Sequence, residues 1–234
     1  MLTPIDIHTH DSGRIPGAVV SGDPGQVARW IAEYPDGMFS VGIHPWSIPA
    51  DASSTGNMQP LLDELEAVAA DEQVVAIGET GLDSLRGAPM PVQEELLRRH
   101  IALSESLHKP LVLHTVRTFN HMIALRREYG RALSQPWIFH GFRGKPQLAA
   151  QLLASGTEDS PVLISFGERF NPLAPAVVPP GNILVETDES QLPIGHILQH
   201  VADARGESPD ELHAILQSNV RRVIGSGTAW ATSL

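Results

Sequence analysis

The sequence contains no cysteine among its 234 residues. Disulfides and thiolate metal ligands are therefore excluded, and any metal ion must be bound by histidine, aspartate or glutamate. No stretch is apolar for long enough to cross a bilayer, and the N-terminus has no basic region followed by an apolar run. We therefore expect no association with a membrane, and the cytoplasm is the default location.

Positive charge is also scarce. Sixteen lysine and arginine residues stand against 27 aspartate and glutamate residues, so the formal net charge is −11. This balance argues against broad contact with duplex nucleic acid, which needs a basic surface. It does not exclude an enzyme that takes one anionic group into a metal-lined pocket, because bound cations supply the positive charge there.

Short apolar runs recur along the chain and alternate with amphipathic segments of helical periodicity. Several runs are too short and too apolar to alternate, which is typical of strands buried on both faces of a parallel sheet. Strand and helix alternating eight times predict an α/β fold, a TIM-like (β/α)8 barrel that forms a single domain over residues 1–234. The eight runs are Ile5–Ile7, Ala18–Val20, Phe39–Gly42, Val74–Ile77, Leu111–Leu113, Ile138–Phe139, Val162–Ser165 and Ile183–Val185.

Two local signals refine this expectation. The segment Phe166–Asn182 contains four prolines, which leave little room for a helix, so we expect a loop there and a distorted barrel. Near the end of the chain, Ser208–Glu211 reads as a capping box with Pro209 at the first helical position. The sequence therefore predicts a final helix that begins at this point.

Histidine or acidic residues follow six of the eight apolar runs. His8 and His10 are two positions apart in a predicted strand, so their side chains project from the same face. In barrels of this kind, catalytic residues lie at the carboxyl ends of the strands. We therefore expect the side chains that follow the strands to converge on one metal site. These residues are His8, His10, His44, Glu79, His114, His140 and Asp188, while Asp83 either orients one of the ligands or caps the turn after Gly81.

The segments that carry these residues are DIHTH, GIHPW, IGETGLD, LHTVR, FHGFRG and VETD. In this order, from Asp6 to Asp188, they resemble the TatD family of metal-dependent hydrolases, which are best known as deoxyribonucleases. Two positions depart from the family pattern. Ser84 replaces the usual aromatic residue after GLD, and Glu189-Ser190 replaces the usual small residue and proline after ETD. These differences bear on substrate contacts more than on metal binding.

The resemblance implies a site for two divalent metal ions, with Zn²⁺, Mg²⁺ and Mn²⁺ all compatible with the ligand set. One ion would be held by two histidines and an aspartate, the second by two further histidines, and a glutamate would bridge them. The implied ligands are His8, His10 and Asp188 for the first ion, His114 and His140 for the second, and Glu79 as the bridge. Related barrels bridge their metals with a carboxylated lysine. The only lysines here, Lys109 and Lys145, precede a strand and begin a helix, so neither is placed for that role.

The resemblance further implies hydrolysis of phosphodiester bonds by a water that two metals activate. Asp188 would be both ligand and general base, and Glu79 would be catalytic through the metals. His44 would contact the phosphate or the leaving group, or it is simply a turn histidine before proline. Three basic residues in loops after strands are candidate phosphate clamps, or are merely solvated. They are Arg117, Arg143 and Lys145.

The most direct hypothesis is a deoxyribonuclease acting on DNA ends or short single strands, since the acidic surface disfavours binding along a duplex. One alternative is the same barrel hydrolysing a small amide, lactone or ester, which chromogenic phosphodiesters and carboxylic esters would distinguish. Another is a non-catalytic, metal-binding subunit, although six intact ligand positions count against it. The sequence does not define the oligomeric state.

Overall fold

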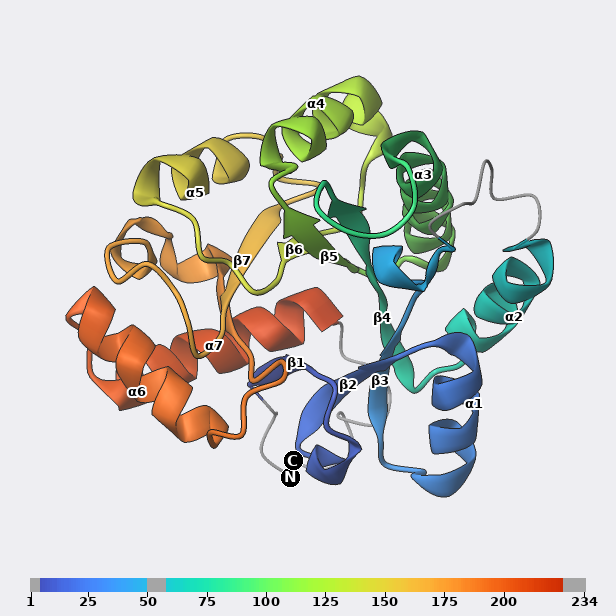
Figure 1. Cartoon of the computed structure of the whole chain (residues 1–234). Helices are drawn as coiled ribbons and strands as arrows, with labels where there is room; N and C mark the ends of the chain where they lie inside the picture. The colour runs from blue at the N-terminus through green and yellow to red at the C-terminus, as the bar shows by residue number, and fades with distance from the viewer. Residues whose placement is uncertain (1–4, 50–57, 225–234) are drawn as a thin grey trace.

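The computed structural model describes residues 5–49 and 58–224. Eight parallel strands form a closed barrel in which neighbouring strands follow the order of the chain, as Figure 1 shows. The predicted α/β barrel is therefore confirmed. The strands are β1 (Asp6–Thr9), β2 (Ala18–Gly22), β3 (Met38–Val41), β4 (Val74–Asp83), β5 (Leu111–Val116), β6 (Trp137–Phe139), β7 (Val162–Phe166) and β8 (Ile183–Val185).

Helices surround the barrel on its outer face (Figure 1). None of those in the described ranges is long and apolar enough to cross a membrane. The α-helices are α1 (Pro24–Glu33), α2 (Gln59–Ala69), α3 (Met90–Leu107), α4 (Phe119–Tyr129), α5 (Pro146–Leu153), α6 (Ile194–Arg205) and α7 (Pro209–Ile224). Short 3-10 turns are η1 (Ser12–Arg14), η2 (Pro45–Ser47), η4 (Gly130–Ala132), η5 (Pro175–Val177) and η6 (Pro180–Asn182).

The barrel is irregular at two of its connections. Between β7 and β8 the chain forms only η5 and η6, which confirms the loop expected from the prolines. The expected alternation of strand and helix is wrong between β1 and β2, where residues 10–17 form only η1. Such a short connection is below the dozen residues that a helical crossover needs. The capping box is confirmed, because Glu211 N donates to Ser208 Oγ and Ser208 N donates to the Glu211 carboxylate.

Apolar side chains fill the barrel interior toward the N-terminal ends of the strands, and α7 closes this end. Val220 and Val223 of α7 pack against the inward-facing side chains of the strands. Asn219 donates its side-chain amide to the carbonyl oxygen of Ile183 at the start of β8. The carboxyl end of the barrel is thereby left for polar side chains. The inward-facing residues of this cluster are Ile7, Ala76, Val112, Ile138, Leu163 and Leu184.

One buried histidine joins a helix to the loop that follows β3. His100 of α3 is fully buried, and its Nε2 accepts a hydrogen bond from the backbone N–H of Ile43 at 3.0 Å. Its Nδ1 donates to the carbonyl oxygen of Leu96 at 2.9 Å. The bond accepted by Nε2 requires the neutral ring, and burial lowers the pKa of His100 to about 4. The imidazole therefore fixes the backbone immediately before His44.

Because the pKa of His100 is lowered in the folded protein, we expect the free energy of unfolding to decrease in mild acid. Below pH 6.5 the unfolded chain binds a proton at His100, whereas the folded protein resists it down to about pH 4. The contribution of His100 to the free energy of unfolding therefore falls by about 2 kcal/mol between pH 7.5 and pH 5. Urea unfolding at the two pH values measures this change. His100→Gln should flatten the dependence, whereas the exposed control His200→Gln should not; equal slopes in all three proteins would refute the prediction.

Candidate metal centre

The polar side chains at the carboxyl end continue the inward faces of the strands. In β5, Val112 packs inside the barrel and His114 follows it two positions later, on the same face. In the same way Ile138 precedes His140. The strand period of two therefore explains why these histidines point into the barrel mouth.

Two strands need an irregularity to present their ligands. In β1, the pairing advances from Asp6 to Thr9 while β2 advances only from Ala18 to Val20. This extra residue is a bulge, and it lets the adjacent residues Ile7 and His8 both lie inside the barrel, which a regular strand would forbid. His8 and His10 nevertheless reach the same site, as the sequence predicted.

The second irregularity lies in β4, where Ile77 to Thr80 pairs with Leu111 to Leu113 of β5. It directs Glu79 into the barrel mouth. The backbone of this segment packs so closely against residue 42, at the end of the neighbouring strand, that residue 42 has no room for a side chain. A Cβ atom at Gly42 of the neighbouring strand end would lie 2.6 Å from the carbonyl oxygen of Glu79. Glycine at this position is therefore a requirement of the site.

Glu79 is the centre of the cluster. Its carboxylate is 5% exposed and lies within 3.4 Å of five imidazole rings that come from four different strand ends, since His8 and His10 share β1. The contacting nitrogens are Nε2 of His8 (3.4 Å), Nε2 of His10 (3.1 Å), Nε2 of His44 (3.1 Å), Nδ1 of His114 (2.8 Å) and Nε2 of His140 (2.7 Å).

The electrostatics of the cluster follow from this arrangement. Burial disfavours the Glu79 carboxylate, but the surrounding imidazoles, His140 foremost, outweigh it and hold the pKa of Glu79 well below its usual range. Burial likewise opposes a charge on His140, yet Glu79 and Glu186 raise its pKa well above the usual value. The cluster is thus a buried Glu79 carboxylate anion surrounded by imidazole rings that interact with its charge.

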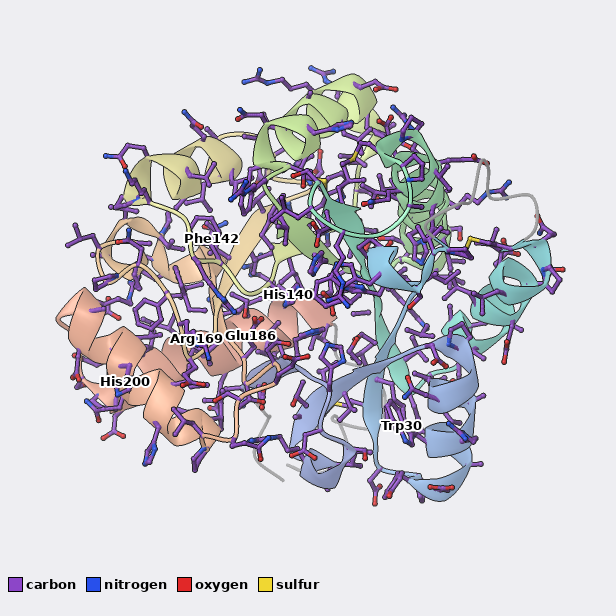
Figure 2. The ribbon with its side chains drawn as sticks, in the orientation of Figure 1. Trp30, His140, Phe142, Arg169, Glu186 and His200 are labelled. Atoms are coloured by element: carbon purple, nitrogen blue, oxygen red, sulfur yellow. The ribbon has the colours of Figure 1, made fainter. Side chains whose placement is uncertain are left out.

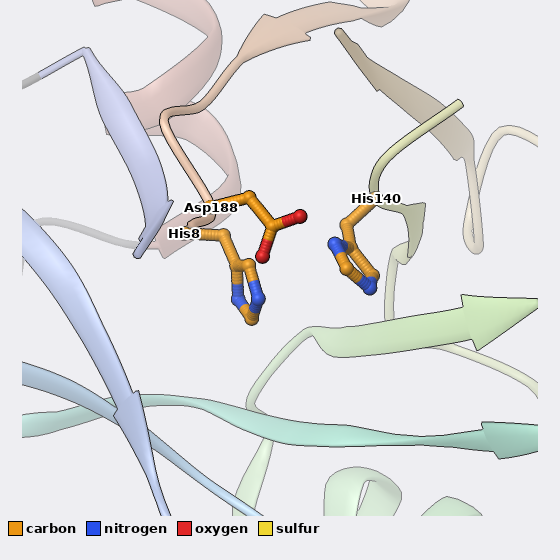
Figure 3. Close-up of side chains that lie close together, drawn as sticks. All are labelled: His8, His140 and Asp188. Atoms are coloured by element: carbon orange, nitrogen blue, oxygen red, sulfur yellow. The ribbon is translucent and has the colours of Figure 1, made fainter. Parts of the chain in front are cut away.

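His8 supplies the clearest indication that this site fits a cation. Its ring is fully buried, and neither ring nitrogen has a hydrogen-bond partner. Burial, together with His140, lowers the pKa of His8, so the ring is neutral and offers a lone pair. A buried polar group without a partner is costly unless something binds it. Figure 3 shows the rings of His8 and His140 converging with the carboxylate of Asp188 on one space.

Ligand atoms gather in three overlapping groups, each within 4.8 Å. These groups cut across the division implied by the family resemblance, since His140 joins His8 and Asp188. His44 takes a ligand-like place beside Glu79 as well as bonding the Trp46 backbone N–H. All six predicted ligands are thus brought together with His44, and their assignment to two ions stays a prediction. The groups are His8–His140–Asp188, His8–His10–Glu79 and His44–Glu79–His114.

Asp83, at the end of β4, supports His114. Its Oδ2 lies 3.3 Å from Nε2 of His114 and accepts a 2.7 Å hydrogen bond from Nε1 of Trp46. Its Oδ1 accepts from the backbone N–H of Leu85, so it also caps the turn. The two roles that the sequence left open for Asp83 are both present. Trp46 is 44% exposed, which leaves indole surface at the rim of the site.

Glu186 gives His140 the same kind of support, and sequence reasoning assigned it no role. It is fully buried, and its Oε1 lies 3.4 Å from Nδ1 of His140 while accepting a 2.5 Å hydrogen bond from the backbone N–H of Gly141. A carboxylate behind a metal-binding imidazole orients the ring and raises its basicity. The signal that could have found it is its spacing of two from Asp188, because positions 186 and 188 continue the inward-facing series that begins at Leu184 of β8.

We expect Glu186→Gln to weaken metal binding by roughly 10–100-fold, which is the usual cost of losing a carboxylate behind a ligand histidine. Calorimetric titration of the metal-free protein with Zn²⁺ or Mn²⁺ measures the change. Glu158→Gln, at an exposed loop, removes the same charge without touching the cluster and should bind as wild type does. Unchanged affinity in Glu186→Gln would contradict the supporting role.

A cleft of about 1010 Å³ lies over the cluster. His44, Arg117 and Arg143 line it, together with Trp46 and both apolar and acidic side chains. Three of the four predicted substrate contacts thus face the cleft. Lys145 is exposed and does not line this cleft.

Fold and site together define a metal-dependent hydrolase built on a TIM-type barrel. The sequence profile of the TatD related DNases matches residues 19–225. The chain therefore belongs to the TatD family.

Relatives and solved structures agree with this. The chain is 27% identical to the "3'-5' ssDNA/RNA exonuclease TatD" of Citrobacter rodentium, over 86% of this chain and 81% of that protein. It is 28% identical to the "uncharacterized metal-dependent hydrolase YcfH" of Escherichia coli K12, over 82% and 76%. The crystal structure of the TatD homologue YJJV of E. coli K12 has a similar fold, with a TM-score of 0.74, 20% identity and coverage of 95% and 98%.

Proposed function

We propose that this protein hydrolyses phosphodiester bonds of nucleic acids, acting on DNA ends or short single strands. The observation that carries the proposal is a buried carboxylate, Glu79, ringed by five imidazoles at the mouth of a barrel. Donors of nitrogen and carboxylate type suit Zn²⁺ and Mn²⁺, and the carboxylates also suit Mg²⁺. We assign the ligands as His8, His10, Glu79, His114, His140 and Asp188.

Divalent ions bound there would polarise a phosphoryl oxygen and lower the pKa of a water molecule. The protein itself contributes a carboxylate that is positioned to accept a proton from this water molecule. Asp188 lies 3.8 Å from Nε2 of His10 on the open side of the cluster. Burial, in the company of two further carboxylates, raises the pKa of Asp188 above its usual value despite His8 and His140. A carboxylate of raised pKa accepts a proton more readily, so Asp188 is suited to act as general base.

The cleft supports a nucleic-acid end as substrate. Its volume of about 1010 Å³ lies at the upper limit of the roughly 300–1,000 Å³ usual for small-molecule pockets. The Arg86 guanidinium lies over the Trp46 ring at 4.0 Å, and the exposed remainder of the indole could stack on a base. The guanidinium groups of Arg117 and Arg143 could pair with phosphates. The net charge of −11 disfavours binding along a duplex. The Citrobacter relative is named as an exonuclease of single-stranded DNA and RNA, which is the same class of activity.

The test is direct. Metal-free protein reloaded with Mg²⁺, Mn²⁺ or Zn²⁺ is incubated with end-labelled single-stranded and duplex oligonucleotides, and the products are separated by length. Progressive shortening from one end is the expected result. If no oligonucleotide and no model phosphodiester is cleaved with any of the three metals, while carboxylic esters or amides are, the proposal is wrong.

A further inference from the structure

A second cavity opens beside the metal centre, between the loops that follow β6, β7 and β8. This side recess has a volume of about 190 Å³. Gly141, Arg143, Asp188 and Glu189 line both the recess and the main cleft, so the two cavities share one border. A ligand that reaches Asp188 from the cleft can therefore place an adjacent group in the recess.

The recess differs from the cleft in its chemistry. Every residue that lines it is polar or glycine, whereas Ile43, Trp46 and Phe119 line the cleft. A nucleobase needs apolar or aromatic surface to stack on, so its place is the cleft. A volume of about 190 Å³ corresponds to roughly six water molecules at ~30 Å³ each, which is room for a small polar group.

Two guanidinium groups line the recess. Arg143 comes from the loop after β6 and Arg169 from the loop after β7; Figure 2 shows Arg169 on the side of the barrel where Glu186 lies. In the described part of the chain, neither side chain makes a hydrogen bond or ion pair. Arginine forks are suited to bidentate binding of a phosphate.

Three of the four carboxylates that line the recess are engaged elsewhere, and the fourth, Glu189, is exposed to solvent at the border with the cleft. Glu186 accepts from Gly141 and faces His140, and Asp188 belongs to the metal centre. Glu168 accepts a 2.7 Å hydrogen bond from the hydroxyl of Ser190. The carbonyl oxygen of Ser190 accepts in turn from Arg14 at 3.0 Å. The wall of the recess is thus held in place while its two arginines remain available.

We propose that the side recess binds the terminal phosphate of a nucleic-acid end, with Arg169 and Arg143 as its ligands. The proposal rests on the proposed nuclease function and sharpens it, because the strand would be positioned by its phosphorylated end as well as by its bases. Cleavage would then occur at the phosphodiester next to that end. Arg169 is the discriminating residue, since it lines the recess and not the cleft.

Four matched single-stranded oligonucleotides test this, with a phosphate on the 5′ end, on the 3′ end, on both or on neither. For wild type we expect KM to be about tenfold lower or more for one phosphorylated end, as charge-assisted contacts predict. Arg169→Gln should remove this preference. Arg131→Gln, an exposed arginine in η4, carries the same charge change and should keep it. Equal KM values for all ends in wild type, or a preference that survives in Arg169→Gln, would overturn the proposal.

A binding measurement separates this proposal from the nuclease function. Metal-free protein is titrated with thymidine, thymidine 5′-monophosphate and thymidine 3′-monophosphate in a calorimeter. Tighter binding of one monophosphate than of thymidine by wild type and Arg131→Gln, but not by Arg169→Gln, supports the recess even if no oligonucleotide is cleaved. Equal affinity of wild type for thymidine and for both monophosphates refutes it even if oligonucleotides are cleaved.

Discussion

Asp188→Asn should reduce kcat for oligonucleotide cleavage by about 10³-fold or more, within the range that general-base removal commonly costs. The amide keeps the size of the side chain but cannot accept the proton of a water molecule. The backbone should tolerate the change. Asp188 has a φ of +53°, a left-handed conformation in which asparagine is among the favoured residues, and its backbone bonds to His8 and His10 do not involve the side chain.

Asp36→Asn, in the turn after α1, is the matched control and should retain full activity. The unfolding temperature and metal content of Asp188→Asn distinguish a chemical from a structural defect. A variant that stays folded and metal-loaded but is inactive supports the role of Asp188 as base. A folded variant with kcat within a factor of three of wild type would exclude that role.

Glu79→Gln should have the largest effect on the metal centre. The amide has the shape of the carboxylate, but it carries no charge and only one of its two polar atoms accepts a hydrogen bond. We expect bound metal to fall from two divalent ions per chain to at most one. Losing several kcal/mol of metal-derived stabilisation corresponds to roughly a 10³-fold decrease in kcat/KM. Elemental analysis and the oligonucleotide assay measure the two effects.

The same substitution should destabilise the metal-free protein. His140 is left without its main counter-charge, and an uncompensated buried charge commonly costs about 3 kcal/mol or more. Glu94→Gln is a suitable control, because Glu94 of α3 also contacts a histidine, His121, at 2.7 Å but lies away from the cluster. Urea unfolding in the presence of a chelator provides the measurement. Full metal content in Glu79→Gln would show that Glu79 is not a bridging ligand.

The sequence by itself determined the barrel and the types of residue at its mouth. Strands buried on both faces are recognisable as short apolar runs, because no polar residue can face solvent from them. The carboxyl ends of parallel strands meet at one end of a barrel, so the residues after each run had to lie near one another. The proximity of His114, His140 and Asp188 was therefore predictable without knowledge of how the strands are paired.

Only the tertiary structure decided how these residues face one another. The bulges in β1 and β4 depend on pairing with the neighbouring strands. The bulge in β1 allows both Ile7 and His8 to lie inside the barrel, which simple alternation would not, and the bulge in β4 directs Glu79 inward. The approach of His44 to Glu79 depends on the loop that His100 of α3 holds in position. Neither feature has a local signature, because each is set by contacts between residues far apart in the chain.

The supporting role of Glu186 and the side recess were likewise decided by the tertiary structure. Glu186 acquires its role only from the position of His140 on another strand, and the recess exists only because loops after three different strands leave a gap between them. Periodicity reports which face of its own strand a side chain occupies. Arg143 and Arg169 are 26 positions apart in the sequence, and it is the packing of their loops that brings both to the same recess.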